Sequence, residues 1–91
     1  MTDATILEYL KVNLGITSTA YDTRLTDLIT SAKAMITREG ITLNTAGSYE
    51  DAQIVIMYAA WMWGKRDSAD GMPRMLRWAL NNRLFSEKGA V

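Results

Sequence analysis

Apolar residues recur at helical spacing in the first half of the chain. An apolar face that Thr2 or Asp3 can cap at its start predicts a helix over residues 3–13. The most regular pattern follows, with six apolar residues at steps of four, three, one, three and four, and it predicts a helix over residues 20–38. After this helix, β-favouring residues predict a short extended piece at 41–43.

An unbroken apolar run from Ile54 to Trp63 marks the third element, predicted as a helix over residues 49–66. Ser48, with Asp51 three positions later, approximates a capping box at its start. At about 1.5 Å per residue the run covers only about half of the roughly 30 Å hydrocarbon layer of a membrane, so we expect a core helix. A helix that is apolar on every side needs cover on every side, and we expect part of this cover to come from another copy of the chain.

The last element begins near Pro73, whose missing N–H is tolerated in a first helical turn, and is predicted over residues 72–85. Residues 86–91 then form a tail, so residues 1–85 make one domain: an all-α bundle of about four helices. The residues predicted to face the core from this last helix are Met72, Met75, Leu76, Ala79, Leu80 and Leu84, with Arg74, Arg77, Asn81 and Asn82 toward the other side.

The amino-acid composition excludes several classes of chemistry. The 91 residues contain no cysteine and no histidine, which excludes disulfides, thiolate nucleophiles, imidazole catalysis and Cys/His zinc sites. No phosphate-binding loop or nucleophile elbow is present, and the loop at 67–71 lacks most of a calcium-binding pattern. The start of the chain does not resemble a signal peptide. We therefore expect a cytoplasmic protein that is not an enzyme, binds no cofactor or metal and does not enter membranes.

Three tryptophans in a chain of this length favour protein contacts. Trp61 and Trp63 are two positions apart, so they cannot share a helical face, and Trp78 lies in the last helix. One interpretation makes them core residues with one partly covered. The other makes them anchors of an interface, because Trp, Met and Arg are enriched at interface centres.

The net charge of zero conceals an uneven distribution. Residues 1–60 carry four basic and seven acidic side chains, a net −3, whereas residues 61–91 carry six basic and three acidic ones, a net +3. Chance and helix-dipole placement explain this asymmetry as well as a head-to-tail contact between copies does. The candidate interface residues are Trp61, Trp63, Lys65, Arg66, Arg74, Arg77, Trp78, Arg83, Asp22 and Asp27.

A DNA-recognition helix is an alternative interpretation of residues 72–85. Arg74, Arg77 and Asn81 have the i, i+3, i+7 spacing of side chains that contact bases. A helix-turn-helix, however, joins its helices by about three or four residues, and the stretch 64–71 is longer. A small helical DNA-binding regulator and an oligomeric scaffold with no viral role stay open as alternatives.

The order of elements resembles the head–tail connector proteins of phages over nearly the whole chain. The carriers of the resemblance are the first segment at 2–11 (TDATILEYLK), the amphipathic helix at 22–36, the aromatic and basic end of the third helix at 61–66 (WMWGKR) and the Pro, Leu and Arg pattern at 72–80 (MPRMLRWAL). The linker at 41–47 departs from the family, in which a longer extended excursion is common.

This resemblance implies a structural virion protein at the head–tail junction, assembled in the host cytoplasm. In such connectors about twelve copies commonly form a ring below the portal protein. The ring extends the DNA channel toward a stopper or tail-completion protein, with transient and non-specific contact to double-stranded DNA. A conduit of neutral net charge agrees with this role, since a strongly basic wall would retain the duplex.

Overall fold

The chain folds into four α-helices in the computed structural model, which describes residues 1–65 and 71–89. The helices are α1 (Asp3–Leu14), α2 (Asp22–Arg38), α3 (Tyr49–Lys65) and α4 (Arg74–Gly89). No strand occurs in these two described ranges. The prediction of a small all-α bundle of four helices is therefore confirmed.

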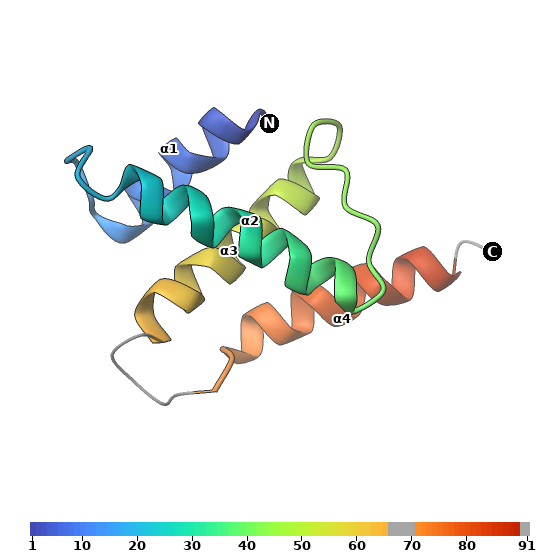
Figure 1. Cartoon of the computed structure of the whole chain (residues 1–91). Helices are drawn as coiled ribbons and strands as arrows, with labels where there is room; N and C mark the ends of the chain where they lie inside the picture. The colour runs from blue at the N-terminus through green and yellow to red at the C-terminus, as the bar shows by residue number, and fades with distance from the viewer. Residues whose placement is uncertain (66–70, 90–91) are drawn as a thin grey trace.

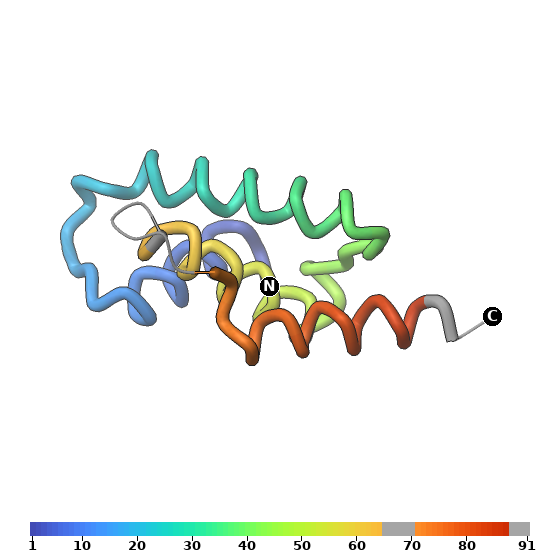
Figure 2. Tube along the Cα trace, turned by 90° about the horizontal axis from the view of Figure 1, so that it is seen from below, coloured from blue at the N-terminus to red at the C-terminus, as the bar shows by residue number. Residues whose placement is uncertain are grey.

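Helix α3 lies at the centre and packs against each of the other three helices. Figure 2 shows the molecule from below, with α2 along one side, α4 along the opposite side, and α1 and α3 between them. Figure 1 shows that both outer helices run in the same general direction, from left to right. The two helices therefore lie on opposite sides of α3 and share a general direction, but they are inclined to each other in the view of Figure 1.

The core follows the predicted periodicity most closely in α2. Its buried residues, Leu25, Ile29, Ala32 and Ile36, all belong to the stripe that predicted this helix. Helix α1 is capped as expected, because the Thr2 side chain accepts a hydrogen bond from the Thr5 N–H at 3.2 Å. The remaining core side chains are Ile6, Leu10, Ile41, Ala52, Ile54, Val55, Ile56, Tyr58, Ala59, Leu76 and Leu80.

Helix α3 is covered more completely than its sequence predicted. From Ala52 to Trp63 every side chain is buried or half-buried within the single chain. The other three helices and the linker after α2 supply this cover. The expectation that another copy covers part of α3 stays a prediction, and it concerns only the half-buried residues of this stretch.

Helix α4 differs from its prediction in length and in rotation. It continues to Gly89, so residues 86–89 are helical and not part of a tail. Met75, predicted to face the core, is 70% exposed, whereas Leu76 and Leu80 are buried. The apolar stripe predicted for this helix was too broad to fix which side packs inward.

The linker after α2 is irregular. Residues 41–44 form no strand, although Ile41 is buried in the core. No helix in the described ranges combines the length and the apolar character needed to cross a membrane.

Gly40 makes the turn from α2 into this linker. Its φ of 99° is a conformation that residues with a Cβ rarely adopt, and an added Cβ would meet Leu84 Cδ1 at 3.4 Å. We expect Gly40→Ala to lower the free energy of unfolding by about 1–2 kcal/mol, measured by urea denaturation. Gly64→Ala is the control, because Gly64 is helical with open space around it and should be neutral or stabilising. Equal stability of the two variants would contradict this role of Gly40.

Candidate functional site

The outer face of α4 exposes three large apolar side chains. Met75, Trp78 and Phe85 are exposed by 70%, 63% and 78%, the side opposite the buried Leu76 and Leu80. We define the outer face of α4 as these three residues together with three exposed polar ones. Its members are Arg74, Met75, Trp78, Asn81, Asn82 and Phe85.

One end of this face is hollowed. Arg74, Met75 and Trp78 line an open depression of about 360 Å³ whose walls are almost entirely apolar. Arg74 is exposed and makes no ion pair with any described residue. An exposed Trp beside Met and Arg is typical of the centre of a protein–protein interface, where these residue types are enriched.

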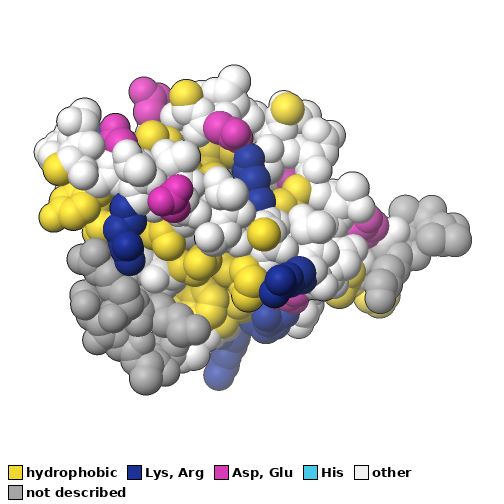
Figure 3. All heavy atoms as spheres, in the orientation of Figure 1, with side chains coloured by type: hydrophobic (Ala, Val, Ile, Leu, Met, Phe, Trp, Pro, Cys, Tyr) yellow, Lys and Arg dark blue, Asp and Glu magenta, His cyan; other side chains and the backbone are white. Residues whose placement is uncertain are grey.

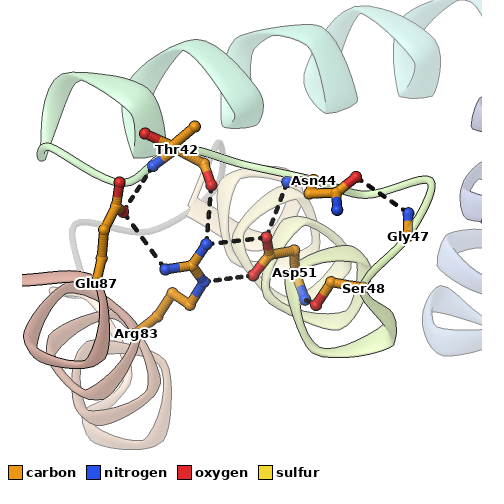
Figure 4. A network of polar contacts seen from close by, with 7 residues as sticks. All are labelled: Thr42, Asn44, Gly47, Ser48, Asp51, Arg83 and Glu87. Atoms are coloured by element: carbon orange, nitrogen blue, oxygen red, sulfur yellow. Dashed lines mark hydrogen bonds and ion pairs between the residues drawn. The ribbon is translucent and has the colours of Figure 1, made fainter. Parts of the chain in front are cut away.

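A buried ion pair fixes the rotation of α4. Arg83 donates from Nε to Asp51 Oδ1 at 2.7 Å and from Nη2 to Asp51 Oδ2 at 3.3 Å. Asp51 lies in the first turn of α3 and is only 1% exposed. Figure 4 shows the two side chains meeting between α3 and α4. Arg83 therefore turns toward the core, which places the outer face on the opposite side of the helix.

The same cluster ties down the linker before α3 (Figure 4). Arg83 Nη2 also donates to the Thr42 carbonyl at 2.8 Å, and the Asn44 N–H donates to Asp51 Oδ2 at 2.8 Å. Glu87 accepts from the Thr42 N–H at 2.8 Å and lies 3.4 Å from Arg83 Nη1. An irregular linker thus gains partners for its backbone from α3 and α4.

Two carboxyl groups of this cluster have lowered pKa values. Burial on its own raises the pKa of Asp51, but hydrogen bonds from Arg83 and from the Asn44 N–H, with the positive charge of Arg83, outweigh it. Hydrogen bonds from Thr42 lower the pKa of Glu87. Both side chains therefore accept these hydrogen bonds as ionised carboxylates.

A second ion pair joins α4 to the end of α2. Arg77 donates from Nη1 and Nη2 to the two carboxylate oxygens of Glu39, at 2.6 and 3.2 Å. This fork geometry holds the guanidinium in one orientation and raises the pKa of Arg77. The Arg77 side chain is 43% exposed, but Glu39 holds its guanidinium toward the end of α2, so it is not free to act with Arg74 and Asn81.

The predicted interface residues do not form one surface. Asp22, Arg77 and Arg83 form ion pairs within the chain, Asp22 with Lys11 at 2.7 Å. Trp61 and Trp63 are half-buried and stack edge-on against Tyr58 and Tyr21, with ring centroids 5.4 and 5.5 Å apart. Arg74 and Trp78 share the outer face of α4, Asp27 is exposed on α2, and Arg66 and the Lys65 side chain lie outside the described residues.

The opposite charges of the two halves are partly matched inside one chain. The pairs Arg77–Glu39 and Arg83–Asp51 each join a basic residue of the last third to an acidic residue of the first two-thirds. A contact between copies would have to use charged side chains that form no ion pair within the described chain, such as Arg74 and Asp27.

Sequence reasoning missed the role of Asp51. The capping-box interpretation was half right, since Ser48 Oγ accepts from the Asp51 N–H at 3.2 Å. The Asp51 carboxylate binds Arg83 instead of reaching back, and the Ser48 N–H donates to the Asn44 carbonyl at 2.8 Å. No local signal could have found Arg83, which is 32 positions away.

No group of three or more acidic side chains that could hold a metal ion occurs in ranges 1–65 and 71–89. The chain matches no protein-family model, and comparisons with curated proteins and with solved structures find no significant match.

Loss of Arg83 should be strongly destabilising. In Arg83→Leu the buried Asp51 carboxylate keeps its charge without a counterion, so we expect the free energy of unfolding to fall by about 3–5 kcal/mol. Arg24→Leu is the matched control, because Arg24 is exposed and makes no ion pair with the described residues, and a change within about 0.5 kcal/mol is expected. Urea denaturation measures both, and a similar small loss in each variant would show that the pair does not hold α4.

The stability should also depend on pH through Asp51. Its folded pKa lies below the usual 3.8, so its contribution is complete above about pH 4 and is lost as the pH falls through the folded value. We expect Asp51→Asn to be less stable at neutral pH and to lose less further stability between about pH 5 and 2. Glu8→Gln, which removes an exposed carboxylate of α1, is the control in the same thermal unfolding experiments. An unchanged slope in Asp51→Asn would contradict the assignment.

Proposed function

We propose that the chain is a structural adaptor of a phage virion that assembles as a ring of identical copies below the portal protein. The ring extends the DNA channel toward a stopper or tail-completion protein. Contact with the passing duplex is transient and does not depend on base sequence. This proposal combines the resemblance of the sequence to head–tail connectors with the surface of α4.

The observation that carries the proposal is the outer face of α4. Met75, Trp78 and Phe85 stand exposed on one side of a helix whose other side is locked into the core. Several large apolar side chains on one exposed face mark an interaction surface. A subunit whose role is assembly needs such a surface and needs no catalytic group.

The same face argues against the DNA-binding alternative. A recognition helix needs its polar side chains free to reach base edges, but Arg77 is held by Glu39 in a two-pronged ion pair. Between Arg74 and Asn81 the exposed side of α4 carries Met75 and Trp78, which cannot read base edges by hydrogen bonds. Protein contacts suit this helix better than a base-reading role.

The oligomeric state tests the proposal. Negative-stain images and native mass spectra of the purified chain should show closed rings, and Trp78→Ala should shift them toward monomers by weakening each contact by about 2 kcal/mol or more. Val12→Ala is the matched control, because Val12 is a comparably exposed apolar residue on α1 and should leave the rings intact. A monomer or dimer that retards one duplex sequence in preference to others would overturn the proposal in favour of a regulator.

A further inference from the structure

The outer side of α2 matches the outer face of α4 in spacing. Asp27, Ser31, Ala34 and Arg38 are exposed on α2 at i, i+4, i+7 and i+11, directly opposite its buried stripe. The outer face of α4 contains the same spacing in the four residues Arg74, Trp78, Asn81 and Phe85, which are also exposed.

The two sides are placed so that identical copies can stack. Figures 1 and 2 show α2 and α4 on opposite sides of the molecule and running in the same general direction. When one copy follows another, the outer face of α4 on the first can meet the outer side of α2 on the second. Because α2 and α4 are inclined to each other within one copy, a rotation between successive copies brings the two helices into a parallel register. Such a contact is heterologous, and it repeats around a ring.

We propose that these two surfaces form the contact between neighbouring copies, with α4 of one subunit packed along α2 of the next; this inference rests on the proposed ring assembly. In the parallel register, Arg74 lies opposite Asp27 and forms an ion pair with it. Neither residue has an ion-pair partner among the described residues of its own chain, so both charges are available to a neighbour.

The remaining positions of this register are also complementary. The bulky Trp78 lies opposite Ser31, whose small side chain leaves room for an indole. Asn81 lies opposite Ala34, and Phe85 lies opposite Arg38, where a guanidinium over an aromatic face is favourable. The surface around α2 is mixed in charge, as the view in Figure 3 shows, so it offers no general attraction to a basic helix. Specificity for α4 therefore comes from the register of the four pairs.

Disulfide trapping tests the register directly, since the chain contains no cysteine of its own. We expect Ala34→Cys and Asn81→Cys proteins, mixed and oxidised, to form a disulfide-linked dimer containing one chain of each, because a disulfide requires Cα atoms within about 7 Å. A chain carrying both substitutions should give a ladder of covalent oligomers on a denaturing gel. An Asn81→Cys protein that links to itself would instead indicate pairing of α4 with α4, and no disulfide at all would also overturn the inference.

Charge reversal provides an independent test. We expect Asp27→Arg and Arg74→Asp each to weaken assembly about threefold to tenfold in sedimentation experiments, and the double variant to return to within about threefold of wild type. Glu8→Arg, on α1 and outside both surfaces, is the control for a general charge effect. A double variant that assembles no better than the single ones would contradict the Asp27–Arg74 pair.

These experiments separate the contact from the function. Closed rings without the Ala34–Asn81 disulfide would refute this contact and leave the proposed ring assembly standing. A disulfide between open, filament-like assemblies would support the contact and refute the proposed ring.

Discussion

The ion pair between Asp51 and Arg83 is the interaction on which the rest of the structure depends. Asp51 is nearly inaccessible to water, so its charge is tolerable only while Arg83 and the Asn44 N–H bind it. Those bonds join the start of α3, the linker before it and the middle of α4 at one point. Helix α4 contributes only Leu76 and Leu80 to the fully buried core, so polar contacts help to set its rotation.

This dependence explains which parts of the fold could be predicted from the sequence. Helix α2 has a narrow apolar stripe, so its periodicity gave both the helix and its buried side. In α4 the apolar residues spread around much of the circumference, and periodicity alone could not choose the inner side. That choice is made by Glu39 and Asp51, which bind Arg77 and Arg83 from 38 and 32 positions away. Pairings over such separations leave no trace in local spacing.

The prediction that another copy covers part of α3 is still untested, because the chain itself buries this helix only in part. A second apolar surface lies on α4, where Met75, Trp78 and Phe85 are exposed. These three residues stand among polar ones in the sequence, so their spacing did not predict a common face. Trp61 and Trp63 are half-buried and pack against the core, whereas Trp78 is exposed. Of the ten candidate interface residues, Asp27, Arg74 and Trp78 are therefore the exposed ones that make no ion pair with a described residue.

The outer face of α4 could pack either on α4 of another copy or on α2 of another copy. These two contacts differ in which charged and aromatic side chains they leave without a partner. If α4 paired antiparallel with α4 of another copy, Arg74 could lie over Phe85, but Asp27 and Arg38 would stay without partners on the far side of each dimer. Such a pair is closed by its twofold symmetry and cannot grow. In the proposed contact of α4 with α2, each copy uses both sides and pairs Arg74 with Asp27 of a neighbour, so every added copy presents the same two surfaces again. Whether such growth ends in a ring depends on the rotation between successive copies, which is set by how α4 and α2 cross. The Asp51–Arg83 pair fixes the direction in which α4 faces, so in the proposed ring a buried contact inside one subunit would help to determine the curvature of the assembly.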